Sequence, residues 1–148
     1  MILREFEVRK DLDLYIKGDI SAFKESFPGV SLPSEMITEI SEEIKLIAGK
    51  SETVGITAVH ESTPIGFVVG SLQLFYVVPF LYIESIYVEP EYRGNGFGGA
   101  LLEKAEKWGE SQGAKFVQLH VSVGKESAIG SYRKSGYSNT RLQMDKML

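Results

Sequence analysis

The sequence contains no cysteine among its 148 residues and only two histidines. The absence of cysteine excludes disulfide bonds, thiolate metal sites and a cysteine nucleophile. No group of histidine, aspartate and glutamate has the spacing of metal ligands, so we expect no metal. The net charge of −4 makes the whole chain a poor electrostatic match for nucleic acid, which we do not expect as a partner. The length suits a single domain over residues 1–148, because a domain typically takes about 100–200 residues.

The sequence also lacks a long apolar run at its N-terminus, so we expect no secretory signal and a cytoplasmic protein. One uncharged stretch, residues 62–83, is long enough to span a bilayer. It is nevertheless rich in Val, Phe and Tyr, which favour strands, and Glu61 and Glu84 flank it where a membrane span would have basic residues. We therefore predict two strands joined by a turn at Val78-Pro79, and no membrane partner.

Hydrophobic periodicity predicts an α/β fold with strands and helices following each other along the chain. Strands are expected over residues 2–9, 52–60, 65–77, 80–88 and 115–123, with one or two final strands over 137–148. Helices are expected from Asp11 to the break at Phe27-Pro28-Gly29, from Ser34 to Gly49, over 97–112 and over 126–135. The order is βααβββαβα followed by β, which predicts helices flanking one mixed central sheet.

Glycine is abundant, with 15 residues, and it is concentrated after the strand 80–88. The run Arg93-Gly94-Asn95-Gly96-Phe97-Gly98-Gly99 lies directly before the most regular predicted helix. Backbone N–H groups without side chains in front of them can converge on phosphate oxygens, and a helix N-terminus adds about half a positive charge. Gly98 and Gly99 are expected inside the first helical turn, where each glycine costs about 1 kcal/mol. This cost favours a phosphorylated ligand over a flexible turn.

The same glycines spell G-x-G-x-x-G, the fingerprint of dinucleotide-binding domains. That fingerprint needs an acidic residue about twenty residues further on, at the end of the next strand. Here the next strand ends Leu119-His120-Val121-Ser122-Val123, without an acid. No Gly-Lys-Ser/Thr follows the loop either, which excludes a P-loop. A dinucleotide-binding enzyme therefore stays only as the weakest alternative.

Three segments together resemble the GNAT N-acetyltransferases. Residues 93–98 match the family signature R/Q-x-x-G-x-G/A, and the strand before them ends Ile86-Tyr87-Val88-Glu89-Pro90, similar to L-x-V-x-P. Residues 128–137, Ala-Ile-Gly-Ser-Tyr-Arg-Lys-Ser-Gly-Tyr, resemble A-x-x-L-Y-x-K-x-G-F. The order of elements also resembles the GNAT arrangement across nearly the whole chain. The resemblance implies an enzyme that transfers acetyl from acetyl-CoA, its co-substrate, to a primary amine by direct attack, without a metal.

The resemblance also implies where acetyl-CoA binds. In GNAT proteins the loop amides hold the pyrophosphate, and the strand before the loop bulges and splays from the next strand, so that its backbone pairs with the pantetheine arm. The implied cofactor-binding residues are Ile86, Tyr87, Val88, Arg93, Gly94, Asn95, Gly96, Phe97, Gly98, Gly99 and Lys125. Two positions depart from the family pattern, because Lys125 replaces a frequent asparagine and Ser131 replaces the usual leucine. Lys125 would reach a cofactor phosphate instead.

The implied catalytic residues are Tyr132 and Glu84. Tyr132 matches the tyrosine that protonates the leaving thiolate, and a phenol stays protonated at neutral pH. Glu84 is the only charged residue between Ser62 and Val88, and a carboxylate on a buried strand is costly unless it is paired or functional. A general base and a structural ion pair are both open for it. Strict alternation predicts that four residues share one strand face: Tyr82, Glu84, Ile86 and Val88.

The two histidines have weaker support as functional groups. His120 alternates with Gln118 and Ser122 along the predicted strand 115–123 and could face the same splay as Glu84. His60 falls near the turn of the predicted hairpin. A structural role is the expectation for both.

Charge is distributed unevenly along the chain. Residues 1–91 carry 7 basic and 15 acidic residues, whereas residues 92–148 carry 9 basic and 5 acidic. The basic part suits an anionic coenzyme. The acidic part suits a cationic amine, although a solvated helix face explains it equally well.

The sequence leaves the acceptor open. A small molecule, a polyamine, an aminoglycoside and a protein N-terminus or lysine all fit, with the loop 27–33 and the final strands expected to shape the choice. The alternative functional class is a non-catalytic acyl-CoA-binding or regulatory module of the same fold. A homodimer also stays open as a partner state.

Overall fold

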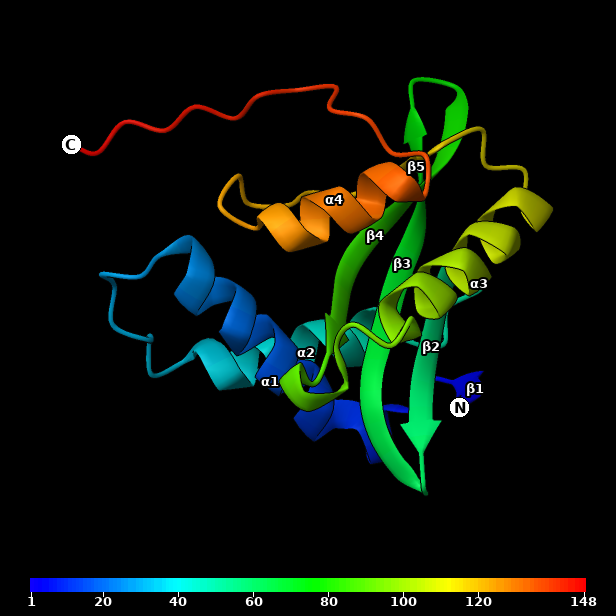
Figure 1. Ribbon diagram of the computed structural model, residues 1–148, viewed down its shortest axis with the longest axis horizontal. Coiled ribbons are helices and arrows are strands. Elements are labelled where there is room, and N and C mark those ends of the chain that lie inside the picture. The colour runs from blue at the N-terminus through cyan, green and yellow to red at the C-terminus, as the bar shows by residue number, and fades with distance from the viewer.

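A computed structural model describes residues 1–148 and shows a five-stranded mixed sheet with helices on both faces (Figure 1). The strands lie in the order β1 (Ile2–Glu5), β2 (Thr53–His60), β3 (Thr63–Phe75), β4 (Val78–Val88) and β5 (Val117–Gln118). Neighbours are antiparallel except β4 and β5, which run parallel. The predicted α/β class with a mixed central sheet is confirmed.

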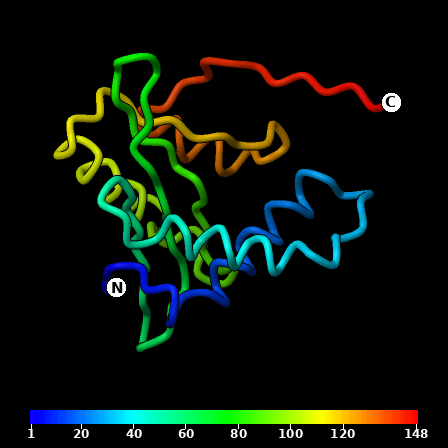
Figure 2. The backbone as a smooth tube through the Cα atoms, turned by 180° about the vertical axis from the view of Figure 1, so that it is seen from behind, coloured from blue at the N-terminus to red at the C-terminus, as the bar shows by residue number.

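The helices form two layers around this sheet. They are α1 (Val8–Ser26), α2 (Met36–Ile47), α3 (Phe97–Ser111) and α4 (Glu126–Lys134), with a short 3₁₀ helix η1 (Pro90–Tyr92). α1 and α2 cover one face through a core that includes Phe67 and Val69, and α2 crosses the sheet when seen from behind (Figure 2). α3 covers the other face through Leu101 and Leu102, and Tyr132 of α4 packs against this second core. None of these helices is both long enough and apolar enough to cross a membrane.

α1 lies close against the sheet because Gly18 faces it. A Cβ atom added at Gly18 would lie 2.9 Å from the Phe67 ring and from the Tyr87 Cβ, so no larger residue fits without a shift. Gly109 has the same role in α3, where an added Cβ would lie 3.0 Å from Leu81. Two helical glycines thus set the distance of each helix layer from β3 and β4.

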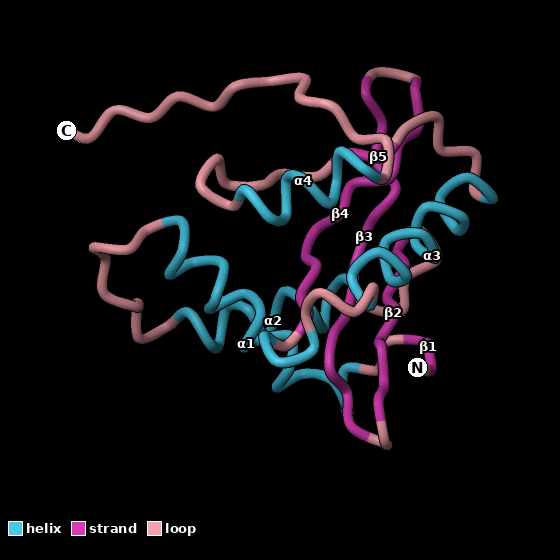
Figure 3. Tube along the Cα trace, in the orientation of Figure 1, coloured by secondary structure: helices cyan, strands magenta, loops and turns pink.

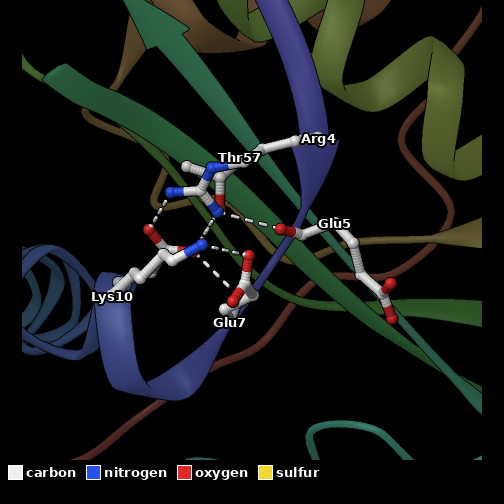
Figure 4. A network of polar contacts seen from close by, with 6 residues as sticks. Arg4, Glu5, Glu7, Lys10 and Thr57 are labelled. Atoms are coloured by element: carbon white, nitrogen blue, oxygen red, sulfur yellow. Dashed lines mark hydrogen bonds and ion pairs between the residues drawn. The ribbon is translucent and has the colours of Figure 1, made fainter. Parts of the chain in front are cut away.

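The start of α1 is fixed by a carboxylate, Asp11, that has no exposed surface. Both terminal guanidinium nitrogens of Arg4 donate to it, at 2.8 and 2.7 Å, and the Glu7 backbone N–H and the Thr57 hydroxyl donate to its Oδ2, each at 2.8 Å. Figure 4 shows Arg4 and Thr57 converging from the two strands, with the Lys10–Glu7 ion pair beside them. Burial acts to raise the pKa of Asp11, but the hydrogen bonds from Arg4, Glu7 and Thr57 outweigh it and hold the pKa below its usual value.

Four sequence-based predictions differ from the structure. α1 begins at Val8, inside the predicted strand 2–9, and β3 turns into β4 at Tyr76-Val77 instead of Val78-Pro79, with Tyr76 at φ +55°. β5 spans two residues instead of 115–123, because it leaves β4 after Gln118. The final strand predicted over 137–148 is absent, because β5 is only two residues long and gives a further strand little backbone to pair with. The tail runs away from the sheet as a loop (Figure 3). The uncharged stretch 62–83 forms β3 and the first part of β4, as the two-strand prediction requires.

Candidate functional site

β4 carries a bulge at Glu84. In the ladder with β3, Val69 pairs with Ser85 and Gly70 pairs with Ile83, so Glu84 is the extra residue on β4. A bulge bends the strand and increases its local twist. It therefore marks the point at which the second half of β4 takes a new direction.

The side chains at the bulge both point to the face that α1 and α2 cover. The Ser71 hydroxyl donates to Glu84 Oε1 at 2.6 Å, and the Ser85 hydroxyl donates to Asp19 Oδ1 of α1 at 2.8 Å. A regular strand would send two consecutive side chains to opposite faces. The prediction that Tyr82, Glu84, Ile86 and Val88 share one face is therefore wrong. Ile86 and Val88 pack instead against the core beneath α3, which contains Leu101 and Leu102 and is called the α3 core below.

The bulge also coincides with the separation of β4 from β5. The two strands pair only at Leu81 with Val117 and at Tyr82 with Gln118, and the Tyr82 hydroxyl lies 2.9 Å from His120 Nδ1 where the gap begins. From residue 83 to residue 88, β4 has no strand on this side. Its edge therefore presents unpaired backbone groups to any extended ligand. The predicted backbone contacts all lie on this open edge: Ile86, Tyr87 and Val88.

The loop at the end of β4 presents free backbone amides. No N–H group of residues 94–99 has an acceptor within the protein, and the first one that does is that of Ala100, which bonds the Gly96 carbonyl at 3.0 Å. Gly94 and Gly96 adopt φ +79° and +83°, a region that favours glycine. Neither backbone geometry nor packing requires glycine at position 99, because a Cβ there would meet nothing within 4 Å. The free amides and the open space at this helix N-terminus suit a diphosphate.

The larger side chains of the loop turn back onto the protein. Arg93 Nε donates to the Val88 carbonyl at 2.8 Å, and the guanidinium lies 5.5 Å from the centroid of the Tyr87 ring. Asn95 Nδ2 donates to two carbonyls of the preceding turn, at 3.2 and 3.3 Å. The Phe97 ring packs edge-on against two others, those of His60 and Tyr92. These side chains brace the loop and leave its amides facing outward.

α4 brings the other two predicted residues to the opposite side of the gap. Tyr132 packs against the α3 core, with its ring centroid 6.0 Å from that of Tyr137, and burial raises the pKa of its phenol. Its hydroxyl forms no hydrogen bond within the protein. Lys125, at the start of α4, forms an ion pair with Glu25 near the end of α1. This ion pair joins α1 to α4 next to the gap.

A comparison with known families decides what this arrangement belongs to. The sequence pattern of the Acetyltransferase (GNAT) family matches residues 20–137, which include the bulge, the loop and α4. The chain belongs to the GNAT acetyltransferase family. The resemblance deduced from three short motifs is thereby confirmed.

Individual relatives agree with this assignment. The aminoglycoside N(6′)-acetyltransferase type 1 of Stenotrophomonas maltophilia is 28% identical over 102 residues, which are 63% of this chain and 57% of that protein. A putative acetyl transferase from Pyrococcus furiosus has a TM-score of 0.76 and 29% identity, covering 99% of this chain and 100% of that one. A predicted acetyltransferase from Clostridium acetobutylicum, solved with acetyl-CoA, has a TM-score of 0.78 and 16% identity, covering 99% of this chain and 95% of that one.

The chain spans between 24% and 57% of the length of the first curated relatives that it matches. The solved structures instead match over nearly their whole length. The GNAT fold is thus shared along the full chain, whereas sequence similarity to curated relatives is local.

The residues present fit acetyl-CoA as a ligand of this GNAT site. The amides of residues 94–99 are free for the diphosphate, and the open edge of β4 leads from them toward the bulge. A Cβ at Gly99 would project into space that no protein atom occupies. The fit rests on the backbone, which explains why the side chains of Arg93 and Asn95 can be engaged elsewhere.

Sequence reasoning missed Asp19 as a residue of the site. It lies four residues after buried Tyr15 and eight after buried Asp11, so helical spacing alone places it on the buried face of α1. Burial raises the pKa of Asp19 to about 6, the Ser85 hydrogen bond acts in the opposite direction, and the charges of Glu43 and Glu84 raise the pKa further. Its carboxylate forms no ion pair with a lysine or arginine.

Proposed function

We propose that this chain is an N-acetyltransferase that moves acetyl from acetyl-CoA to a primary amine by direct attack. The observation that carries the proposal is the continuity of the free amides 94–99 with the open edge of β4 at its bulge. We call the amides 94–99 and the open edge of β4 together the cofactor track. The amide end of the track suits a diphosphate, and its other end lies at the bulge, next to the carboxylates of Glu84 and Asp19. Family membership supports the same reaction, and the absence of cysteine excludes an acetyl-cysteine intermediate.

Acetyl-CoA supplies an acetyl group that is activated as a thioester. The backbone of residues 86–88 orients it, and a backbone N–H there polarises its carbonyl. Tyr132 donates a proton to the leaving sulfur, for which the raised pKa of its phenol is suitable because the proton is retained at neutral pH. Lys125 pairs with Glu25 in the free protein, and exchanging this partner would free its ammonium for a phosphate of the cofactor.

The proposed acceptor is a cationic amine that approaches from the face of α1 and α2. Glu84 and Asp19 line this face at the bulge, and neither forms an ion pair in the protein. Because the relative from Stenotrophomonas maltophilia acts on aminoglycosides, a 6′-amino aminoglycoside is one candidate. Polyamines and the amines of lysine or of a protein N-terminus are the others.

The proposal is tested by thiol release from acetyl-CoA across a panel of an aminoglycoside, a polyamine, free lysine and an N-terminal peptide. We expect release with at least one amine, together with thermal stabilisation of the protein by CoA. Stabilisation by CoA without release on any amine would favour a non-catalytic acyl-CoA-binding module. Stabilisation by NAD and not by CoA would overturn the assignment of the loop.

A further inference from the structure

Asp19 occupies an unusual place for a carboxylate. It lies on the buried face of α1, which contacts β3 and β4, and its Oδ1 accepts a hydrogen bond from Ser85 immediately after the bulge. Oδ2 accepts no hydrogen bond and no lysine or arginine neutralises the charge. A half-buried carboxylate with a single hydroxyl partner loses part of its hydration at a cost in folding free energy, so stability does not account for this residue.

The bulge at Glu84 is what brings Asp19 to the reactive end of the open edge. Without the extra residue, Ser85 would face the α3 side and could not reach α1. With it, the Asp19 carboxylate lies opposite the point where β4 leaves β5. In the proposed complex this is the end of the track where the acetyl group is presented.

The charged groups that face Asp19 all raise its pKa. Glu43 approaches from α2 and Glu84 from β4, while Tyr15 of α1 is buried beside it and neutral. Burial and the two neighbouring carboxylates raise the pKa of Asp19 to about 6, against the hydrogen bond from Ser85. A base works best when its pKa lies near the working pH.

Building on the proposed function, we propose that Asp19 takes up the proton that the acceptor ammonium must lose before its nitrogen attacks the thioester. An N–H bond of the ammonium breaks and an O–H bond forms on Asp19, directly or through one water. The nitrogen then forms the N–C bond to the acetyl carbon while the C–S bond breaks. Tyr132 gives its proton to the leaving sulfur and is reprotonated by the second proton that leaves the nitrogen, and Asp19 returns its own proton to solvent. Glu84, held by Ser71, attracts the ammonium.

The test compares kcat at saturating amine from pH 5 to 9 for the wild type and Asp19→Asn. The asparagine keeps the shape and the acceptor for Ser85, so we expect the fold and CoA-induced stabilisation to persist. We expect kcat to fall about a hundredfold, with KM for the amine little changed, and the acidic limb near pH 6 to disappear. Asp13→Asn changes an exposed aspartate of the same helix. It is the matched control and should leave the whole pH profile of kcat unchanged.

Two further variants separate Asp19 from its neighbours. Ser85→Ala removes the hydrogen bond that lowers the pKa of Asp19, so the acidic limb should move to higher pH. Glu84→Gln should raise KM for a cationic amine and retain an acidic limb, moved to lower pH because the charge of Glu84 raises the pKa of Asp19. Loss of the limb in Glu84→Gln but not in Asp19→Asn would overturn the assignment of Asp19 alone, as would a change in KM without a change in kcat. Wild-type protein that binds CoA but turns over no amine would overturn both proposals.

Discussion

The buried carboxylate of Asp11 gives the sharpest prediction about stability. Its four hydrogen bonds come from Arg4, Glu7 and Thr57, three of them to Oδ2 and one to Oδ1 (Figure 4). Asp11→Asn replaces one of these oxygens with an amide nitrogen that faces the Arg4 donors and leaves the guanidinium without its partner. Removing one member of a buried ion pair typically costs about 3–5 kcal/mol, and we expect a loss of about 4 kcal/mol here.

The loss is measured by urea unfolding at pH 7. With a slope of about 1–3 kcal/mol per molar urea, the midpoint should fall by about 2 M. For a protein of this size the melting temperature should fall by about 10 °C. Asp13→Asn is the control on the same helix, and its exposed side chain should cost less than about 0.5 kcal/mol.

The difference in stability between the wild type and Asp11→Asn should also depend on pH, and the pKa of Asp11 fixes the direction of this dependence. The pKa of Asp11 is lowered on folding, so its contribution is complete above the unfolded pKa of about 3.9 and is lost as the pH falls through the folded pKa. The difference between wild type and Asp11→Asn should therefore be constant from pH 5 to 7 and shrink below about pH 4. A loss under 1 kcal/mol at pH 7, or a difference that does not shrink in acid, would refute this account of the network.

Two predictions concern the proposed acetyl-CoA site. Tyr132→Phe should lower kcat about a hundredfold in steady-state assays and leave KM for acetyl-CoA unchanged, because the ring still packs against the α3 core; an unchanged kcat would remove Tyr132 from the reaction. Gly96→Ala should weaken CoA binding by calorimetry at least tenfold, because φ is +83° there and the amide would turn away. Gly29→Ala, where an added Cβ meets nothing, is its control, and equal affinity of both variants would contradict the role of the loop.

The backbone part of the site could be predicted from the sequence because its signal is local. Gly94 and Gly96 precede a regular helix and Gly98 and Gly99 lie in its first turn, where their cost already indicates a ligand. The structure adds that Arg93 Nε bonds the Val88 carbonyl and that the Phe97 ring packs against His60. Residue type alone does not distinguish a side chain that binds from one that braces.

The resemblance implied a bulge and a role for Glu84, but the position of the bulge and the place of Asp19 could not be predicted, because they depend on a break in strand periodicity. Glu84 and Ser85 share a face only through the bulge, which no residue type in β4 announces. Asp19 reaches them across more than sixty residues of sequence, so its partner is visible only in the fold. The short β5 has the same origin, since β4 turns away from it at the bulge.

The four hydrogen bonds of Asp11 also have a consequence for how the chain folds. Thr57 is 46 residues further along the chain, so the start of α1 is completed only when β2 lies beside β1. Until then the carboxylate of Asp11 is solvated more favourably by water than by the protein, and the first turn of the helix is not yet held against the sheet. Because closing such a loop is slower than forming a helical turn, the N-terminal segment should acquire its protection from hydrogen exchange together with the β1–β2 ladder, as one cooperative unit.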